Sequence, residues 1–381
     1  MGAVSLPGSV MSVLVVAHRF SLGFGGVPES ILLLARELGE YGIRLDVFSR
    51  DGFACDVGEL SDLPSAGQPR QRAGMPDVAG YGCVFVAGAW NPAAWWIAMQ
   101  ARRNGVRLVY TPKGNLARAE FRRWRDLKKF PYLATIELSL LAICDRIVFS
   151  SELEQNRSVL LFRRKSVVIP EPFRGPPLEP AVGARSGTPV RFGFMAEIAP
   201  RKGLADFVSA FIAWQRRGNL EAELHIAGQP RPGSENYYEK VQAMAATAPR
   251  PDMIRFLGPL RGNRREDFYE SIDFFVCPTK FESFGLTPLE ALWHGKPVMV
   301  TESLGVLEFI SDPHSIISLG RGSLDEILDA LEAAMVRREC YMRAASAWRM
   351  RRNLSADRIA LRFAHEFGFR HVVAENLRSP E

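Results

Sequence analysis

The sequence predicts an α/β protein with two Rossmann-like, doubly wound domains that face a cleft. Three observations predict this fold. Short, nearly all-apolar strand patterns alternate with amphipathic helical patterns along the chain. A proline-rich segment interrupts the alternation once, after which it restarts. The length of 381 residues exceeds what one ordinary core accommodates. Strands that are apolar on both faces are typical of parallel sheets covered by helices.

The first series of strands and helices predicts an N-terminal domain over residues 1–170. Its expected strands are Val13–Ala17, Arg44–Phe48, Cys83–Ala87, Arg107–Tyr110, Arg146–Phe149 and Val167–Ile169. Helical patterns separate these strands, and the clearest are Glu29–Glu40 and Pro131–Ile143. Each strand is followed by a helical or loop segment, as a βαβ series requires.

The next segment, residues 171–189, is predicted to be a linker, because closely spaced prolines continue neither a sheet nor a helix. A second domain is expected over residues 190–355. Its expected strands are Arg191–Met195, Glu223–Ala227, Ile254–Leu257, Phe274–Cys277, Val298–Thr301 and Ser315–Ser318. The clearest helix runs from Leu204 to Arg217 and ends at Gly218. The last stretch, residues 356–381, is helical without a following strand, and we expect it to pack back on the N-terminal domain.

The composition is that of a globular protein, with 47% hydrophobic and 24% charged residues. No apolar run approaches the ~20 residues of a membrane-spanning helix. The five cysteines are scattered without metal-ligand spacing, which indicates reduced core residues of a cytoplasmic protein.

The net charge of +6 arises entirely from residues 1–170, which contain 21 basic and 15 acidic residues. A basic segment, residues 118–130, interleaves six cations with Phe121, Trp124 and Phe130. This pattern suits an anionic membrane surface or an anionic lipid-linked substrate. It equally suits a solvated helix face with a core stripe. No nucleic-acid motif accompanies the cluster, so nucleic acid is not an expected partner.

Two glutamates, Glu282 and Glu290, flank the junction between a predicted strand and a short helix that ends at Gly295. Ligands bind at such junctions in open α/β sheets. A competing interpretation is a capping box, with Thr287 as N-cap and Glu290 reaching back to it. Capping explains why Glu290 stands in the first turn, but it does not explain Glu282.

Two cations, Arg201 and Lys202, precede Gly203 and the helix that begins near Leu204. Cations at a helix N-terminus oppose the helix dipole, and Asp206 offsets only part of that cost. We therefore expect a bound anion there, with a diphosphate as the best fit.

A glycine-rich turn with Gly25 and Gly26 follows the first strand, although its spacing does not match the dinucleotide-binding fingerprint. Tight packing is the usual explanation of such a turn. Neither an Asp-x-Asp pair nor histidines at ligand spacing occur in the sequence. We expect no metal and no other cofactor.

Together these motifs resemble the retaining glycosyltransferases of family 4, also called group 1, which have the two-Rossmann-domain GT-B fold. The matching pieces are the Gly25–Gly26 turn, Pro200–Gly203, His225–Gly228, Phe256–Gly258, and the Glu282 and Glu290 pair with Phe284–Leu286 between them. The stretches Tyr110–Leu116 and Leu127–Lys129 resemble the branch that assembles bacterial surface polysaccharides.

The resemblance implies a role for each matching residue. Glu290 would hold the ribose of a nucleotide sugar, and Glu282 would contact the donor sugar. Arg201 and Lys202 would neutralise the diphosphate. The candidate catalytic residues are Lys113, Arg201, Lys202 and Glu282. The candidate nucleotide-sugar-binding residues are Gly25, Gly26, Arg201, Lys202, Glu282, Phe284, Gly285, Leu286 and Glu290.

Three positions depart from the family pattern. Glu197 stands where the family usually has an arginine, and Lys113 stands where many members have a histidine. Glu171 replaces the asparagine of a Pro-Asn-Gly motif.

The expected function is metal-independent, retaining transfer of a sugar from a nucleotide-diphosphate sugar to a growing, lipid-linked bacterial polysaccharide or oligosaccharide. The N-terminal domain would serve the acceptor side and the C-terminal domain the donor. The enzyme would work in the cytoplasm, peripherally on the inner face of the plasma membrane. The alternative function is a catalytically weak nucleotide-sugar-binding or scaffold subunit of a polysaccharide-assembly complex.

Overall fold

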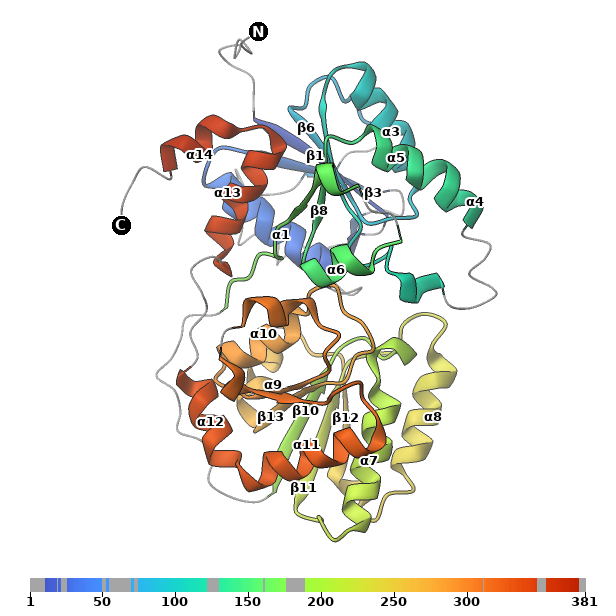
Figure 1. Ribbon diagram of the computed structural model, residues 1–381, viewed down its shortest axis with the longest axis vertical. Coiled ribbons are helices and arrows are strands. Elements are labelled where there is room, and N and C mark those ends of the chain that lie inside the picture. Colours follow the sequence, from blue (N-terminus) through green and yellow to red (C-terminus); the bar gives the residue numbers. More distant parts are fainter. Residues whose placement is uncertain are drawn as a thin grey trace. The chain divides into compact units, whose positions relative to one another are not determined.

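The computed structural model describes residues 11–18, 20–21, 26–49, 53–54, 70–71, 75–121, 130–159, 162–175, 189–310, 312–347 and 354–376. The chain divides into two compact units (Figure 1). The N-terminal unit comprises Met1–Arg174 and Arg352–Glu381, and the C-terminal unit comprises Gly175–Arg351. Most of the predicted linker, residues 176–188, lies outside the described residues.

The N-terminal unit contains a seven-stranded parallel sheet with the order β5-β3-β1-β6-β7-β8-β9. Its strands are β1 (Ser12–Ala17), β3 (Arg44–Ser49), β5 (Arg70–Gln71), β6 (Cys83–Ala87), β7 (Arg107–Thr111), β8 (Arg146–Phe149) and β9 (Ser166–Val168). All six predicted strands are present. The prediction missed β5 and the small pair β2 (Phe20–Ser21) and β4 (Phe53–Ala54). Each of these strands is only two residues long, which is too short to show a periodic pattern in the sequence.

Helices cover both faces of this sheet (Figure 1). On one face lie α1 (Gly26–Gly39) and α13 (Ala356–Phe367), followed by α14 (Arg370–Asn376). On the other lie α3 (Pro92–Arg103) and α5 (Leu138–Ile143). The remaining helices are η1 (Arg118–Phe121), α4 (Phe130–Tyr132), the π-helix η3 (Leu133–Glu137), α6 (Glu152–Arg157) and η4 (Arg163–Lys165). Alternate residues of β1, β3, β6, β7 and β8 therefore enter opposite cores, which explains why these strands read as largely continuous apolar runs.

The helix near the end of the chain belongs to the core of the N-terminal unit. Phe363 and Phe367 of α13 contact the ring of Phe85 in β6, with ring centroids 5.7 and 5.2 Å apart. Residues 171–174 also belong to this unit, and Glu171 and Phe173 are buried in it.

The C-terminal unit contains a six-stranded parallel sheet with the order β12-β11-β10-β13-β14-β15. Its strands are β10 (Val190–Met195), β11 (Ala222–Ala227), β12 (Ile254–Gly258), β13 (Phe274–Cys277), β14 (Val298–Val300) and β15 (Ile316–Ser318). All six were predicted, to within a residue or two. The fold class predicted from the sequence, two doubly wound parallel sheets, is confirmed.

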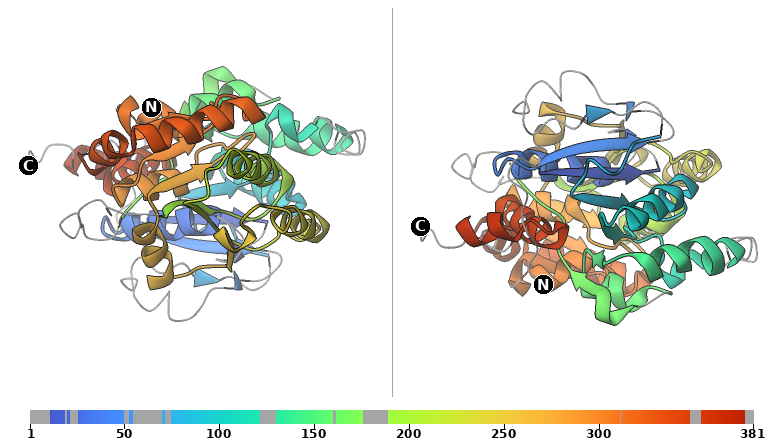
Figure 2. Two further views of the ribbon diagram at one scale, coloured as in Figure 1. Left: turned by 90° about the horizontal axis from the view of Figure 1, so that it is seen from below. Right: turned by 90° about the horizontal axis from the view of Figure 1, so that it is seen from above.

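The main core of the C-terminal unit lies between its sheet and the helices α7 (Leu204–Arg216), α8 (Glu235–Ala245) and α11 (Leu324–Val336). The other face carries α9 (Asn263–Ser271) and α10 (Leu286–Trp293), and α12 (Arg338–Ala347) follows α11 (Figure 2). Gly193 of β10 faces α9, because a Cβ added there would lie 2.8 Å from the ring of Phe268.

The strand order reverses between β10 and β13. From β10 the chain builds outward through β11 to β12, and from β13 it builds outward in the other direction to β15. The loops that follow β10 and β13 therefore leave the same edge of the sheet as neighbours. This reversal is the switch point at which open α/β sheets bind ligands.

Gly203 allows these two loops to touch. It caps α7 with a left-handed φ of +69°, and a Cβ added there would lie 1.9 Å from the carbonyl oxygen of Pro278 in the loop after β13. Only a residue without a side chain fits this approach.

We predict that Gly203→Ala destabilises the C-terminal unit more than Gly218→Ala does. Both glycines have a left-handed φ, which costs an L-residue roughly 1–2 kcal/mol. Only Gly203 adds a backbone clash, which costs roughly a further 1–3 kcal/mol. Nothing lies within 4 Å of a Cβ added at Gly218, so Gly218→Ala is the matched control. Thermal denaturation followed by circular dichroism measures the difference, and equal losses would show that the close approach is not required.

Candidate functional site

The loops at the switch point of the C-terminal unit are bonded to each other through their backbones. The N–H of Lys280 donates to the carbonyl oxygen of Arg201 at 2.8 Å, and the hydroxyl of Thr279 donates to the same oxygen at 3.2 Å. The backbone of Glu282 in turn bonds Ser303 and Gly305, in the loop after β14, at 2.9 and 3.1 Å. Three strand-end loops thus form one connected surface that carries the predicted site residues.

Glu282 lies against both predicted cations. Its carboxylate pairs with the ammonium of Lys202 and lies 3.4 Å from the guanidinium of Arg201. Burial raises the pKa of Glu282, but the charges of Lys202 and Arg201 outweigh burial and hold this pKa below its usual value. The structure therefore joins Glu282, Arg201 and Lys202 in one cluster.

The expectation that Arg201 and Lys202 are poorly compensated is wrong. Asp206, the acid that was expected to offset them, pairs instead with Lys280 at 2.9 Å. Glu282 provides the compensation from a loop about eighty residues further along the chain. A negative charge so distant in sequence is not visible in the local pattern.

Glu197, the acid at the position where the family usually has an arginine, also contacts this cluster. Its carboxylate pairs with Arg201 and lies 4.0 Å from Arg231. Among the described residues, three cations contact two carboxylates in this cluster, a formal balance of +1, from +3 and −2. The remaining positive charge favours an anionic ligand.

The capping box predicted at Thr287 is wrong. Helix α10 begins at Leu286, and its N-cap is Gly285 with a left-handed φ of +104°. Because glycine takes this conformation without a steric cost, the helix begins earlier than the Thr287 pattern suggests. Glu290 is thereby free of a capping role.

The Glu290 carboxylate is held by two residues of α9. Arg265 contacts both of its oxygens, with Nε 3.1 Å from one, and the hydroxyl of Tyr269 donates to it at 2.5 Å. Tyr269 is buried, and its ring stacks on His294 with centroids 5.1 Å apart. Burial and the charge of Glu290 raise the pKa of Tyr269 well above its usual range, so its hydroxyl keeps the proton that it donates. Glu290 is therefore oriented before any ligand arrives.

Sequence reasoning missed Arg265 and Tyr269. Their spacing of four residues places them on one face of a helix, so the sequence could have shown that the two side chains lie together. The pattern could not identify their partner, because Glu290 lies on a different helix.

The predicted Phe284–Leu286 segment offers backbone rather than side-chain groups. Phe284 is buried and packs against Phe309 with ring centroids 5.7 Å apart. Gly285 and Leu286 begin α10, and the first N–H groups of a helix have no carbonyl partner within the helix. These donors suit a phosphate oxygen.

In the N-terminal unit, Lys113 forms a buried ion pair with Glu171. Its ammonium lies 2.6 Å from each Glu171 oxygen, and the hydroxyl of Ser30 in α1 donates to the same carboxylate. The side chains of Lys113 and Glu171 are 7% and 10% exposed. Two of the three departures from the family pattern are thus direct partners. Sequence reasoning missed Ser30, and although it marked Glu171 as a departure from the family motif, it placed this residue in the linker and did not predict its pairing with Lys113.

Lys113 is also held through its backbone. It has a left-handed φ of +50°, which is strained for a lysine. The adjoining N–H of Gly114 donates to the buried carboxylate of Glu154, which also accepts two hydrogen bonds from Ser150, at 2.7 and 2.8 Å. Burial raises the pKa of Glu154. The turn after β7 is therefore fixed from two sides.

A second strained position lies at the end of the neighbouring strand β6. Trp90 has a φ of +68°, and its N–H donates to Glu137 at 2.7 Å. Glu137 ends the π-helix that interrupts the predicted helix Pro131–Ile143. Burial raises the pKa of Glu137. The sequence periodicity did not predict this interruption.

Two predicted features of the N-terminal unit fall largely outside the described residues. Gly25 is not described, and Gly26 is the exposed first residue of α1. Residues 122–129 of the basic segment are not described either. The roles assigned to these residues stay predictions.

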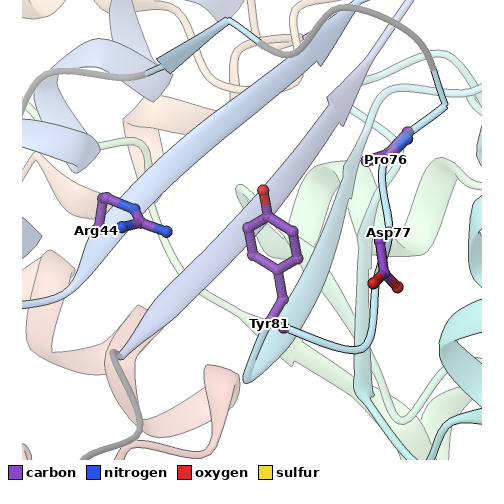
Figure 3. Close-up of a pocket in the computed structure, with 5 residues that line it drawn as sticks. Arg44, Pro76, Asp77 and Tyr81 are labelled. Atoms are coloured by element: carbon purple, nitrogen blue, oxygen red, sulfur yellow. The ribbon is translucent and has the colours of Figure 1, made fainter.

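A pocket of ≈ 230 Å³ lies at the opposite edge of the N-terminal sheet, at the amino ends of β3 and β6. It is lined by Arg44, Pro76, Asp77, Gly80 and Tyr81. Figure 3 shows the Tyr81 side chain between Arg44 and Asp77, and its hydroxyl donates to Asp46 at 2.8 Å. This pocket is separate from the strand ends that carry the predicted residues.

Within the described part of the chain, no group of three or more His, Cys, Asp or Glu side chains could hold a metal ion. Cys83, Cys144 and Cys277 are buried free thiols, as predicted, whereas Cys340 is exposed. None of the helices in the described ranges is long and apolar enough to cross a bilayer.

Comparison with known families identifies the C-terminal unit. Residues 178–349 match the family model described as glycosyl transferases group 1. This segment is a group 1 glycosyltransferase domain. The match lies within the unit that carries Arg201, Lys202, Glu282 and Glu290.

Curated relatives extend the likeness over most of the chain. A D-inositol 3-phosphate glycosyltransferase of Geodermatophilus obscurus is 25% identical over 359 residues, which cover 83% of this chain and 78% of the relative. The protein of that name from Saccharomonospora viridis is 27% identical and covers 83% and 82%. The lipopolysaccharide core biosynthesis mannosyltransferase LpsB of Rhizobium meliloti is 31% identical, but over 112 residues, which are 29% of this chain and 31% of LpsB.

Solved structures show that the chain has the GT-B fold. The structure of HepE from Anabaena in complex with UDP and glucose superimposes with a TM-score of 0.69 at 15% identity, and it covers 97% of this chain and 100% of HepE. WaaG, a glycosyltransferase involved in lipopolysaccharide biosynthesis, gives a TM-score of 0.64 at 14% identity, with coverage of 93% and 99%.

We predict that Glu282 makes the stability of the C-terminal unit sensitive to acid. Because its folded-state pKa is lowered, its pairing stabilises the unit above the usual pKa of glutamate and is lost as the pH falls through the lowered value. Glu282→Gln should cost about 1–3 kcal/mol near pH 7. The difference from the parent protein should begin to shrink as the pH falls below the usual glutamate pKa of ~4, and it should vanish once the pH has passed the lowered pKa at which the parent's folded Glu282 becomes neutral.

Thermal unfolding between pH 3 and pH 7 measures this dependence. Glu239→Gln, at an exposed position of α8, is the control and should follow the parent curve. Parallel curves for the parent and Glu282→Gln at every pH would contradict the prediction.

Proposed function

We propose that this glycosyltransferase moves a sugar from a nucleotide-diphosphate sugar to a lipid-linked glycan, with retention of the anomeric configuration. The observation that carries the proposal is the cluster of Arg201, Lys202 and Glu282 at the switch point of the C-terminal unit. The group 1 domain supports an enzyme that transfers sugars.

Each part of the donor has a matching group in the C-terminal unit. Glu290, already oriented by Arg265 and Tyr269, accepts hydrogen bonds from the ribose hydroxyls. Arg201, Lys202 and the N–H groups that begin α10 surround the diphosphate. When the diphosphate pairs with the two cations, the Glu282 carboxylate is released to accept hydrogen bonds from sugar hydroxyls.

The chemical step follows from this arrangement. The bond between C1 of the sugar and the diphosphate oxygen breaks, and the oxygen keeps the electron pair. The acceptor hydroxyl oxygen bonds to C1, and its proton passes to the departing diphosphate. Arg201 and Lys202 lower the barrier, because they stabilise negative charge where it develops. We assign no protein nucleophile.

The proposal assigns the neutralisation of the leaving group to side chains rather than to a metal ion. Lys202 and Arg201 lie together in the cluster, and Arg231 lies 4.0 Å from Glu197 beside them. Arginine and lysine stabilise transferring phosphoryl groups in the same electrostatic manner as a metal ion.

The relatives support the classes of donor and acceptor. HepE was solved with UDP and glucose, which supports a nucleotide-sugar donor. WaaG acts in lipopolysaccharide biosynthesis and LpsB is a lipopolysaccharide core mannosyltransferase, which supports a surface-glycan acceptor. The D-inositol 3-phosphate glycosyltransferases favour a small phosphorylated acceptor as the second candidate.

Nucleotide binding is the first test of this function. Titration with UDP, GDP and ADP should raise the melting temperature for one of them, and saturation at 100 times the dissociation constant stabilises a protein by about 2.7 kcal/mol. Glu290→Ala should abolish most of the shift, because it removes the ribose partner. Glu239→Ala, an exposed glutamate on α8, should keep it.

No response of the parent protein to any nucleotide would remove the proposed donor site. Slow hydrolysis of the matching nucleotide sugar then separates an enzyme from the scaffold alternative, which is motivated by the family departures Glu197, beside Arg201, and Lys113.

The proposal includes attachment to the inner face of the plasma membrane through residues 118–130. Replacing Arg122, Arg123 and Lys128 with serine should weaken binding to anionic vesicles, because each cation near the surface contributes about 1 kcal/mol. The control replaces three exposed cations of the C-terminal unit, Arg216, Arg217 and Arg261, and changes the net charge equally. Vesicle cosedimentation measures both, and equal binding by the two variants would refute the role of the segment.

A further inference from the structure

Asn91 is a buried amide whose position in the fold does not explain its burial. It is the N-cap of α3, but its side chain makes no capping hydrogen bond. The residue is 3% exposed, and among the described residues neither Oδ1 nor Nδ2 of its side chain has a hydrogen-bond partner. Asparagine is a favoured N-cap because it usually makes that bond, so capping does not account for Asn91. A buried polar group without a partner costs free energy, which a ligand that supplies the partner recovers.

Tyr132, at the end of α4, carries a second group of this kind. Its ring contacts the ring of Trp90, the residue before Asn91, with centroids 5.6 Å apart. Its hydroxyl is buried and has no hydrogen-bond partner within the part of the chain that the structure describes. Burial and the charge of Glu137 raise the pKa of Tyr132, so the hydroxyl keeps its proton. An amide and a phenol of one small region therefore lack partners.

Aromatic rings surround this region at the carboxyl end of β6. The ring of Trp90 also packs on Phe121, and Phe121 packs on Phe130, both with centroids 5.8 Å apart. Trp90, Phe121 and Tyr132 are half-buried, whereas Phe130 is 46% exposed, so the rings reach the surface. Ligands of parallel α/β sheets bind outside this edge.

The backbone at Trp90 is held in a strained conformation. A φ of +68° is an outlier for a bulky side chain. The N–H of Trp90 donates to the buried carboxylate of Glu137 at 2.7 Å, and the hydroxyl of Tyr110 donates to the same carboxylate at 3.1 Å. Glu137 ends the π-helix Leu133–Glu137, which directly follows Tyr132. Such strain and such π-helical turns both cluster at ligand-binding sites.

We propose that this cluster is a subsite for an uncharged sugar ring of the acceptor glycan. Its four residues are Trp90, Asn91, Phe121 and Tyr132, which all belong to the N-terminal unit. The proposal rests on the proposed function, which supplies a glycan as the acceptor.

The chemistry of a sugar ring matches the cluster. Each sugar hydroxyl both donates and accepts a hydrogen bond, so hydroxyls satisfy the Nδ2 and Oδ1 atoms of Asn91 and the phenol of Tyr132. The C–H face of the ring is apolar and suits the aromatic side chains. Because the unpaired atoms have no exposed surface, a covering side chain moves aside when the sugar binds.

Saturation-transfer NMR of the full chain tests the subsite with the methyl glycosides of glucose, galactose, mannose and N-acetylglucosamine. At least one of them should bind. Asn91→Leu and Tyr132→Phe should each raise its dissociation constant by about threefold or more, the effect of one lost neutral hydrogen bond. Uridine, guanosine and adenosine should not displace the glycoside, because the nucleotide site proposed above lies in the other unit.

Melting temperatures separate binding from a structural role. Both variants remove a polar group without a partner, so they should keep or raise the melting temperature. Tyr81→Phe is the matched control, because its hydroxyl donates to the buried carboxylate of Asp46 at 2.8 Å, at the opposite edge of the same sheet. This control should lower the melting temperature and leave the dissociation constant of the glycoside unchanged.

Three results would overturn the inference while the proposed function stands: no binding of any glycoside, displacement by a nucleoside, or dissociation constants in both variants within about twofold of the parent value. A lower melting temperature in both variants with unchanged binding would assign Asn91 and Tyr132 to the fold instead. The nucleotide titration decides the proposed function separately. Glycoside binding by a chain that responds to no nucleotide would remove the donor site and leave the sugar subsite.

Discussion

Charge compensation at the carboxyl ends of the parallel strands is the interaction on which the candidate site depends. Both sheets are covered on both faces, so their strand ends are where buried polar groups must find partners. Glu282 pairs with Lys202 and Arg201, Glu290 pairs with Arg265, and Glu171 pairs with Lys113. In each case the partner comes from a different loop or helix. These pairs therefore connect the strand-end loops to one another as well as fixing the individual side chains.

The pairs also set the energetics of donor binding. Before a nucleotide sugar arrives, Arg201 and Lys202 are already neutralised by protein carboxylates. In the proposed donor complex a diphosphate would have to displace Glu282, so its net binding energy would be the difference between two ion-pair arrangements rather than the full attraction of an open cationic site. Glu290 differs from Glu282, because its partners Arg265 and Tyr269 are not the groups proposed to bind the diphosphate. Under the proposed function these two contacts would stay in place when the donor binds. Glu282 would then change its partners when the donor binds, whereas Glu290 is already held in place by α9.

The sequence predicted the parts of this arrangement that depend on local pattern. Apolar strand runs identified the twelve described strands that are longer than two residues. Strand-end positions marked Arg201, Lys202 and Glu282 as candidate site residues, but they did not predict that Glu282 pairs with the two cations. Contacts between distant segments were not predictable in this way. The cap at Gly285 was missed because Thr287–Glu290 has the sequence pattern of a capping box. The positive φ of Gly285 has no sequence signal other than the glycine itself. Glu171 was assigned to the linker because prolines flank it, and the sequence does not show that its carboxylate is buried. The partners of Glu290 were missed because they lie on another helix, α9.

The chain order of the N-terminal unit has a consequence for biosynthesis. Phe85 lies in the first segment of this unit, Met1–Arg174, but two of its aromatic neighbours, Phe363 and Phe367, belong to α13 near the end of the chain. The whole C-terminal unit is translated between Arg174 and Arg352. At ~5–20 residues per second the ribosome takes on the order of 10–40 s to make that interval. During that time the part of one sheet face that α13 covers stays exposed, although α1 already covers its neighbouring part. The unit that is synthesised first therefore completes its core last.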